Sequence, residues 1–441
     1  MKGFLAQFLA AACSTLSAAG PPAAVPLQYI RGDVNGDGET NLSDDVSLLN
    51  YLLLAGTAPV CSRAADANHD GELGLSDAVY HLTYLFLSGP PPEYPFPRCG
   101  TAGADDVLDC EAYPPCEFRT MVSGYSVLTT VAGKGQRADD LNEWDPRFEG
   151  GPAAEAELSN PHIAMGDQAG NIYIADKEAH AIRKVTPAGK IFTVAGTNTA
   201  GDHGDAPGPA TERSLNSPNG LWVRDDGGFY ILDLLNNKIR KVDRAGELTT
   251  LFTVPEGIVG GRGLWVSADE SLAYFTSFTE LKRWTPKRGI ETFAGGFTGL
   301  GNIAFDPEGN LVATDREAHR VYRLSSDGTR TPIAGNGTTA GGGDGSPALE
   351  TGLDGVRGIC FRRDGSYFLG THRGSKVWFV DTRGIIHLFL DGVRGSHDGD
   401  GEPVDSPGFK VSEVRAVTLD RFENLLITEN DAGFVRRVVR R

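Results

Sequence analysis

The feature that most constrains this chain is a strand-like unit that recurs six times through residues 125–441. Each unit has an apolar segment, a turn rich in Asp and Gly, and a second apolar segment. A third segment follows, as at 181–185, in which apolar and polar residues alternate as in β-strands with one buried face. The units begin near Pro161, Pro218, Gly261, Gly301, Val356 and Val414. Such a repeat predicts one continuous architecture instead of six separately folded parts.

The sixth unit is one strand short, and a matching strand lies at the other end of the repeat. Most units end in a fourth strand, as at 190–196 and 289–295, but the sixth has none before Arg441. The segment 125–133 has the same pattern as these fourth strands. A strand from the start that completes the last sheet closes a ring and protects its edges. The sequence therefore predicts an all-β six-bladed propeller over 125–441.

Two motifs in this region resemble those of NHL-repeat propellers. They are Asn171-Ile-Tyr-Ile-Ala-Asp176 with His180-Ala-Ile-Arg-Lys184, and Asp315 with His319-Arg-Val-Tyr-Arg323. The resemblance covers the whole repeat region and implies the fold, whereas propellers carry binding, lyase and hydrolase functions alike. His180 and His319 lie in equivalent turns of different units, so we expect them to support the repeat and not to bind a metal.

One polar position recurs at the start of each unit's first strand. Because first strands line the axis of a propeller, these side chains should surround one mouth of its tunnel. Arginine, amide and imidazole groups suit an anion such as a carboxylate or phosphate. The alternative is that each side chain pairs with a carboxylate or carbonyl of a neighbouring blade. We call these six residues the axial ring: His162, Asn219, Arg262, Asn302, Arg357 and Arg415.

Two segments near the start, 33–44 and 66–77, have the oxygen spacing and central glycine of EF-hand calcium loops. The second follows the first by 33 residues. Carboxylate, amide and backbone oxygens at this spacing can surround one Ca²⁺ ion. The carbonyl groups of Glu39 and Glu72 would occupy the seventh position. The predicted ligand residues are Asp33, Asn35, Asp37, Glu39, Asn41 and Asp44 in the first loop, and Asp66, Asn68, Asp70, Glu72 and Asp77 in the second.

Each loop runs into a helix-like segment, 43–54 or 76–87, and each ends in Asp where an EF-hand usually has Glu. The apolar faces of these segments are Val46, Leu49 and Leu53, and Val79, Leu82 and Phe86. The duplicated loop-then-helix pattern from about Arg31 to Gly89 resembles the dockerin family. That resemblance implies calcium binding and docking to a cohesin, often in polysaccharide-degrading assemblies. The Cys- and Pro-rich extension 90–116 departs from the family pattern.

Cysteine usage and the first residues indicate export. Lys2, an apolar run and small residues have the layout of a secretory signal over 1–19. Four cysteines in one small module predict two disulfides. Three pairings can be drawn, and loop placement suggests Cys61–Cys99 with Cys110–Cys116. Cys360, in an apolar strand, is expected to be a buried free thiol.

The expected organisation is therefore a signal peptide at 1–19, a dockerin-like calcium-binding domain at 30–116, a linker at 117–124 and the propeller at 125–441. The net charge of −17 argues against nucleic-acid binding. No stretch after the signal has the length of a membrane span.

We predict a secreted calcium-binding protein whose propeller binds protein or glycan partners, with a polysaccharide-degrading setting implied by the dockerin resemblance. A cohesin-like protein is one such partner. The alternative is an enzyme, a propeller lyase or lactonase-type hydrolase carried by the dockerin-like module. We assign no catalytic residue, because the axial ring lacks the carboxylate with which related lactonases hold a metal. The sequence does not predict the oligomeric state.

Overall fold

The computed structural model describes residues 27–101, 103, 105–110, 113–122, 124–135 and 144–440. The chain divides into two compact units, Met1–Glu117 and Phe118–Arg441. The expected signal peptide lies outside the described residues. Among the described helices, none has both the length and the apolar character needed to cross a membrane.

The first unit is built on two helices that follow the two predicted calcium loops. They are α1 (Leu42–Leu54) and α3 (Leu75–Leu87). The last carboxylate of each loop caps its helix, because Asp44 accepts a bond from the backbone N–H of Asn41 and Asp77 from that of Gly74, both at 2.9 Å. The other elements are α2 (Ser62–Ala65), β1 (Gln28–Tyr29) paired with β2 (Gly100–Thr101), and α4 (Pro114–Met121). Helix α4 crosses the unit boundary and ends within the segment 117–124 that was expected to be a linker.

The disulfides differ from the suggested pairing, which was wrong. The structure joins Cys61 to Cys110 and Cys99 to Cys116. The extension turns back on itself, so that the Ser62 N–H at the start of α2 donates to the Asp109 carbonyl at 3.0 Å and places Cys110 beside Cys61. Both bridges thus fasten the extension to the body of the unit.

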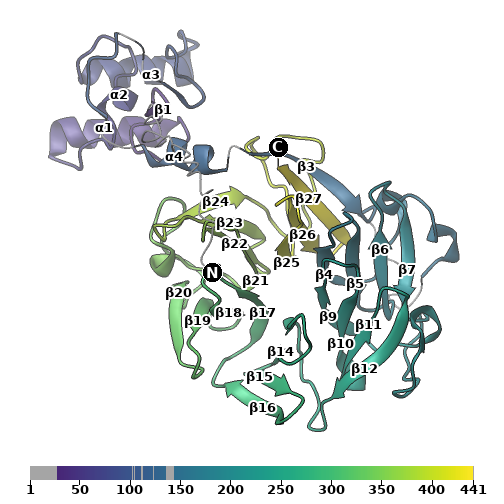
Figure 1. Cartoon of the computed structure of the whole chain (residues 1–441). Helices are drawn as coiled ribbons and strands as arrows, with labels where there is room; N and C mark the ends of the chain where they lie inside the picture. Colours follow the sequence, from purple (N-terminus) through teal and green to yellow (C-terminus); the bar gives the residue numbers. More distant parts are fainter. Residues whose placement is uncertain are drawn as a thin grey trace, which may run out of the picture. The chain divides into compact units, whose positions relative to one another are not determined.

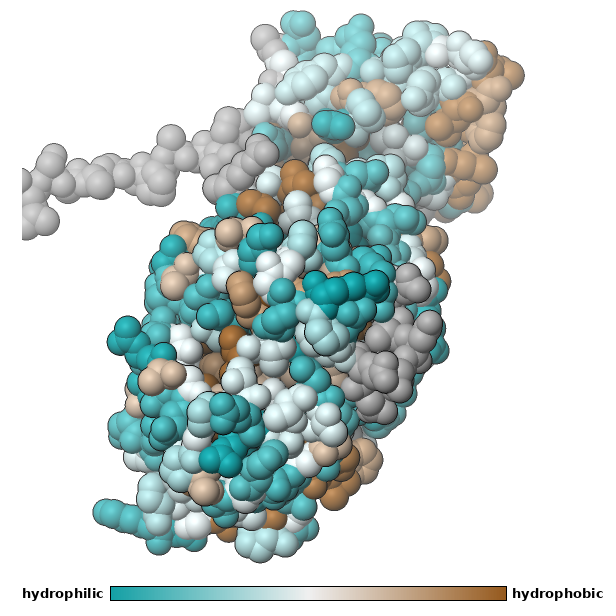
Figure 2. All heavy atoms as spheres, turned by 90° about the vertical axis from the view of Figure 1, so that its right-hand side faces the viewer, coloured by the Kyte–Doolittle hydropathy of each residue, from teal (hydrophilic) through white to brown (hydrophobic). Residues whose placement is uncertain are grey.

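The helix faces also differ from expectation. Val46, Leu53, Val79 and Phe86 are 50 to 63 % exposed, and the helices instead bury Leu48 and Ala78 together with loop carboxylates. A unit of this size has little core, so the inward positions are taken by small and loop-facing side chains. The exposed apolar residues recur at equivalent places on the two helices: Leu42, Val46, Leu53 and Leu54, and Leu75, Val79, Phe86 and Leu87. Apolar atoms of this unit are visible as brown spheres in Figure 2.

The second unit is a six-bladed β-propeller, as predicted, in which inner strands surround the centre of the ring (Figure 1). Blades 1 to 3 contain β4 (Pro161–Gly166), β5 (Ile172–Asp176), β6 (Ala181–Val185) and β7 (Ile191–Ala195); β9 (Pro218–Val223), β10 (Phe229–Asp233), β11 (Lys238–Val242) and β12 (Glu247–Thr253) with the short β8 (Gly208–Pro209); and β13 (Leu264–Val266), β14 (Ala273–Ser277), β15 (Glu280–Thr285) and β16 (Gly289–Ala294).

Blades 4 to 6 contain β17 (Leu300–Phe305), β18 (Leu311–Asp315), β19 (Arg320–Leu324) and β20 (Arg330–Ala334); β21 (Val356–Phe361), β22 (Tyr367–Thr371), β23 (Lys376–Val380) and β24 (Ile386–Leu390); and β25 (Val414–Leu419), β26 (Leu425–Glu429), β27 (Phe434–Arg440) and β3 (Tyr125–Ala132). Short 3-10 helices lie at η1 (Pro146–Phe148), η2 (Ala153–Glu155), η3 (Ala210–Glu212), η4 (Leu234–Asn236) and η5 (Ala348–Glu350).

The ring closes as the sequence predicts. Strand β3 pairs antiparallel with β27, which makes it the fourth strand of blade 6. Leu128 on β3 lies opposite Val438 and is fully buried in a core shared by blades 5 and 6. The strand from the start of the repeat therefore supplies both the outer edge and part of the core of the last blade.

The repeated motif residues join strands and blades. Asp176 forms a buried ion pair with Arg183 on the next strand at 3.1 Å and accepts the backbone N–H of Ser159 at 2.6 Å. Blades 2 and 6 repeat this with Asp233–Arg240 and Glu429–Arg436. His180 and His319 each accept an N–H at 3.1 Å from the segment that leads into the next blade, from Ser217 and Gly355. The histidines thus hold consecutive blades together, in agreement with the role expected for them.

We predict that Leu128→Ala lowers the free energy of unfolding of the propeller by about 2–5 kcal/mol, because it opens a cavity in the core. Thr129→Ala, at the adjacent partly exposed position, is the matched control and should cost less than about 1 kcal/mol. All five tryptophans, residues 144, 222, 265, 284 and 378, belong to this unit. Chemical denaturation followed by tryptophan fluorescence therefore reports on the propeller alone. Equal losses for the two variants would contradict the clasping role of β3.

Candidate anion-binding mouth and calcium loops

The second calcium loop brings its three predicted carboxylates together. Asp66, Asp70 and Asp77 each place an oxygen within 4.8 Å of the others. Backbone N–H groups of Asp70 and Gly71 donate to Asp66 at 3.1 and 3.0 Å, which fixes the loop around that side chain. Gly71, with φ +80°, makes the sharp turn at the sixth position. Asn68 donates its amide to Asp70 at 2.8 Å, and Glu72 directs its own N–H to Asp70 at 2.9 Å.

The first loop has the same backbone path and a different carboxylate environment. Asp33 accepts the N–H groups of Gly36 and Gly38, both at 2.8 Å, and the hydroxyl of Tyr113. Asp44 accepts those of Val34 and Asn35 at 2.8 and 3.1 Å. The amide of Asn35 turns to Asp37 at 2.9 Å, the backbone N–H of Glu39 donates to Asp37 at 2.9 Å, and the side-chain oxygen of Asn41 caps α1 through Ser43.

Buried carboxylates in both loops have raised pKa values. Burial raises the pKa of Asp33 to about 7, with repulsion from Asp44 adding to the effect and the Tyr113 hydroxyl opposing it. Burial likewise raises the pKa of Asp77 to about 6, opposed by the N–H of Gly74. A divalent cation relieves both burial and repulsion of such groups, and hard oxygen donors suit Ca²⁺. The donor set in each loop therefore fits calcium.

The extension supports both loops, which the sequence reasoning missed. Tyr113, fully buried, reaches Asp33 of the first loop. Arg31, also fully buried, donates to the carbonyl of Asp66 at 2.8 Å and pairs with Asp106 at 2.5 Å. The only sequence signal for this arrangement was the position of the cysteines that fasten the extension.

The axial ring residues lie at the start of the inner strands, as the alignment predicts. His162, Asn219, Asn302 and Arg357 are 6, 3, 5 and 1 % exposed, while Arg262 and Arg415 are partly exposed. The inner strands approach closely beside them. A side chain at Gly220 would place its Cβ 2.3 Å from the carbonyl of Arg262 in the next blade, so glycine is required there. The six positions therefore converge on one end of the propeller axis.

Three further charged or titratable groups belong to this mouth and were not found from the sequence. Arg316 and His372 directly follow β18 and β22, at equivalent turns of blades 4 and 5, and Glu413 directly precedes β25. Glu413 binds Arg394 at 2.8 Å, Arg415 at 3.7 Å and His372 at 3.2 Å. A signal was present, because the turn after each second strand also faces this end, but the alignment covered first strands alone.

The mouth is strongly electropositive. Burial, followed by repulsion from Arg262, Arg415 and Arg316, lowers the pKa of Arg357 far below its ordinary value. Burial and the arginines Arg316 and Arg415 lower the pKa of Arg262 to about 9. A guanidinium group stays protonated in proteins. The lowered pKa values of Arg357 and Arg262 therefore indicate an excess of positive charge that nearby carboxylates do not balance.

The Arg357 guanidinium is buried without a partner. None of its three nitrogens has a hydrogen-bond partner among the described residues. The same holds for Nε of Arg262, Nδ2 of Asn302 and Oδ1 of Asn219. The alternative interpretation, pairing with a neighbouring blade, describes the Nδ2 of Asn219, which donates to the Gly261 carbonyl at 2.5 Å. Arg415 instead lies 3.7 Å from Glu413 of its own blade. It does not describe Arg357.

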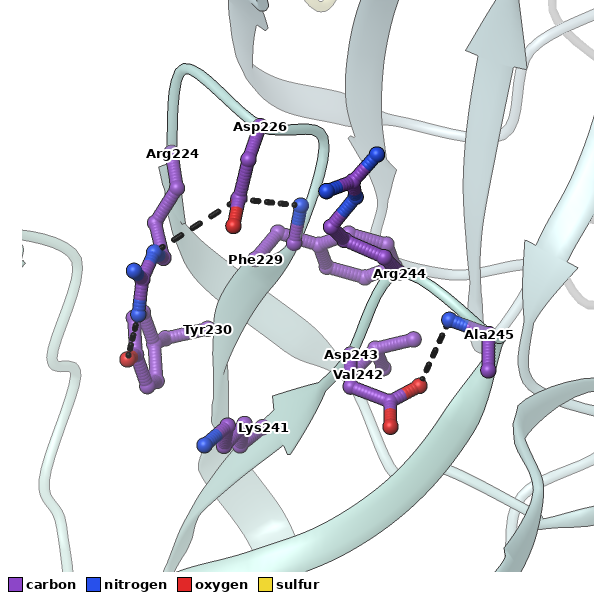
Figure 3. A pocket seen from close by; sticks show the side chains of 10 residues that line it. Arg224, Asp226, Phe229, Tyr230, Lys241, Val242, Asp243, Arg244 and Ala245 are labelled. Carbon is purple, nitrogen blue, oxygen red and sulfur yellow. Dashed lines mark hydrogen bonds and ion pairs between the residues drawn. The ribbon is translucent and has the colours of Figure 1, made fainter.

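A pocket on blade 2 differs from the axial mouth in how its polar groups are paired (Figure 3). It is an open hollow of about 370 Å³ between two turns. Several of its polar groups are already engaged: Arg224 donates to the Tyr230 hydroxyl at 3.3 Å and lies 3.5 Å from Asp226, and Asp243 accepts the N–H of Ala245 at 2.9 Å. A ligand there would find no unmatched polar group among these residues, unlike in the axial mouth.

Comparisons with known proteins support the fold. No protein-family model matches the chain. A segment of 106 residues is 32 % identical to the protein SUPPRESSOR OF QUENCHING 1, chloroplastic, of Arabidopsis thaliana, and this match covers 24 % of the chain and only 10 % of that protein. The dockerin resemblance therefore rests on the loop pattern itself.

Two solved structures are similar in fold. An auxiliary nutrient binding protein of Bacteroides thetaiotaomicron superposes with a TM-score of 0.53 at 14 % identity, over 71 % of this chain and 76 % of that one. Another auxiliary nutrient binding protein, from Bacteroides ovatus, gives a TM-score of 0.52 at 15 % identity, over 77 % and 82 %. At this level of identity the similarity establishes the propeller architecture.

We predict that the propeller loses stability as the pH falls from about 7.5 to about 5.5. His372 lies 3.2 Å from Glu413, which favours the protonated ring, but burial and the four arginines outweigh it and lower the pKa of His372 to about 2. The unfolded chain, with a histidine pKa of about 6.5, then binds the proton first, so this contribution is present above pH 6.5 and lost below it.

The measurement is the thermal unfolding midpoint, followed by tryptophan fluorescence, as a function of pH. His372→Gln should reduce the acid-induced decrease, whereas His203→Gln, at an exposed loop position, should leave it unchanged. If both variants track the parent protein across the range, His372 is not held neutral in the folded state.

Proposed function

We propose that this chain is a secreted binding protein whose propeller holds an anionic ligand at the axial mouth and whose first unit binds calcium. The observation that supports the anion site best is Arg357, 1 % exposed and without a hydrogen-bond partner for any guanidinium nitrogen among the described residues. A buried, unpaired charge costs several kcal/mol, so a ligand that supplies the missing partner would gain that stabilisation on binding.

The surrounding charges favour an oxyanion. Four arginines meet at the mouth, and Glu413 is shared among Arg394, Arg415 and His372. Glu317 lies 2.6 Å from Arg316 and 3.0 Å from Arg373, so it too is already engaged. A carboxylate or phosphate would add the missing negative charge and can accept two parallel bonds from one guanidinium.

The fold similarity agrees with a binding role without defining the ligand. Two structural neighbours are auxiliary nutrient binding proteins, and propellers also host many other functions. A resident hard metal ion at this mouth is a poor fit, because no carboxylate belongs to the axial ring and the nearest groups are arginines.

For the first unit we propose two bound Ca²⁺ ions, one in each loop, and docking to an extracellular protein such as a cohesin. The converging carboxylates support the first part. The equivalent exposed apolar residues of α1 and α3 support the second, because apolar side chains repeated on two helices offer a contact surface. Two disulfides agree with an oxidising, extracellular setting.

We predict that millimolar acetate or inorganic phosphate, at constant ionic strength, raises the unfolding midpoint of the full-length protein by binding the folded state. Arg357→Met should remove this response and raise the midpoint measured without the anion, because it deletes an unpaired buried charge. Arg363→Met is the matched control, since that side chain is 87 % exposed, and it should respond like the parent. An unchanged response in Arg357→Met would refute the site.

We also predict about two calcium ions per chain by titration calorimetry of the full-length protein. Asp77→Ala removes the carboxylate at the twelfth loop position and should abolish one of the two binding events. Glu72→Ala is the control, because its predicted ligand is a backbone carbonyl that the substitution keeps. Absence of binding at millimolar calcium would rule out the proposal.

A further inference from the structure

We infer that the axial mouth takes a small polyhydroxylated anion, a sugar acid or a sugar phosphate, in preference to a simple inorganic or aliphatic anion. This inference rests on the proposed anion site and adds the chemistry of the rest of the ligand. It follows from an unmatched acceptor at Asn219 and unmatched donors on Arg357, Arg262 and Asn302.

The charges are distributed unevenly around the axis. Inner strands β4, β9, β13, β17, β21 and β25 follow one another around the ring, so blades 2 and 5 face each other across it. Arginines stand on blades 3, 4, 5 and 6, as Arg262, Arg316, Arg357 and Arg415. Blades 1 and 2 present the neutral ring members His162 and Asn219, and the charge of Lys177 on blade 1 is paired with Glu178. The mouth therefore has a cationic side and a neutral side.

The neutral side presents hydrogen-bond acceptors. Nδ2 of Asn219 donates to the Gly261 carbonyl at 2.5 Å, which fixes the amide and leaves Oδ1, buried and without a donor among the described residues. Nδ1 of His162 lies 2.9 Å from the Asn160 carbonyl and must therefore carry the hydrogen. Nε2 of the neutral ring is then an acceptor as well. A carboxylate such as acetate has no hydrogen to donate and cannot satisfy either acceptor, and inorganic phosphate offers only its own P–OH groups.

The opposite side presents donors that lack an acceptor, beside Glu413 and Glu317, which are engaged by other cations. The guanidinium of Arg357, Nε of Arg262 and Nδ2 of Asn302 are all buried without an acceptor among the described residues. An oxyanion satisfies these donors, and hydroxyl groups on the same molecule satisfy Asn219 and His162. A neutral sugar would leave the arginines unbalanced, and an anion without hydroxyl groups, such as acetate, would leave the buried amide oxygen of Asn219 unsatisfied, which costs affinity.

The test measures affinities of the full-length protein for gluconate, a hexose phosphate, acetate, inorganic phosphate and glucose. We expect gluconate or the hexose phosphate to bind at least about 10-fold more tightly than acetate or inorganic phosphate, and glucose to bind weakest. Whichever of the first two binds more tightly identifies the source of the anion.

Asn219→Ala separates the hydroxyl contact from the anion contact. It should weaken binding of the hydroxylated anion by about 3- to 10-fold and leave acetate unchanged, whereas Arg357→Met should weaken both. Arg363→Met is the control for folding and should bind like the parent.

The outcomes distinguish this inference from the proposed function. Equal affinities for gluconate and acetate, or an equal effect of Asn219→Ala on both, would overturn the polyhydroxylated ligand and leave the anion site standing. Glucose binding as tightly as gluconate would overturn the role of the charge. No binding of any anion would overturn the proposed function itself.

Discussion

The pairing of β3 with β27 is the constraint on which the propeller depends. It joins two segments about 300 residues apart in sequence and converts six sheets in a row into a closed ring. Because the ring is closed, blades 2 and 5 face each other, and residues as distant as Asn219 and Arg357 come to the same mouth. Without this pairing β27 would expose an unpaired edge, and the core containing Leu128 would open to water.

The charged motif residues of the blades are paired with one another, whereas the axial mouth contains buried charge without a partner in the described part of the chain. Asp176, Asp233 and Glu429 bind buried arginines and backbone N–H groups, so their charges are matched within the blade. The mouth instead concentrates guanidinium groups, and among the described residues Arg357 and the Nε of Arg262 have no acceptor. Because an unpaired buried charge is destabilising, a carboxylate of the protein beside these guanidinium groups would stabilise the fold. The contrast between matched pairs in the blades and unmatched donors at the axis is the strongest physical sign of a ligand site in the molecule.

The first unit is a small domain that buries acidic side chains, and both features lower its stability. Its two core clusters are small, and its loop carboxylates repel each other at neutral pH. Disulfides compensate by fastening the extension, whose Tyr113, Asp106 and associated Arg31 contacts hold both loops from behind. Bound calcium would neutralise the repulsion between the same carboxylates. Disulfides and calcium would therefore both stabilise the loops of this unit.

The sequence by itself determined the six blades, the closing strand, both calcium-loop patterns and the alignment of the axial ring, because strand alternation, turn chemistry and oxygen spacing are local and repeat along the chain. It did not determine the disulfide pairing, the exposed faces of α1 and α3, the bracing by Tyr113, or the addition of Arg316, His372 and Glu413 to the mouth. Those depend on which distant segments become neighbours once the chain has packed. Whether a buried arginine has a partner depends on its three-dimensional surroundings. Only the tertiary structure showed that Arg183 is paired with Asp176, whereas Arg357 has no partner among the described residues.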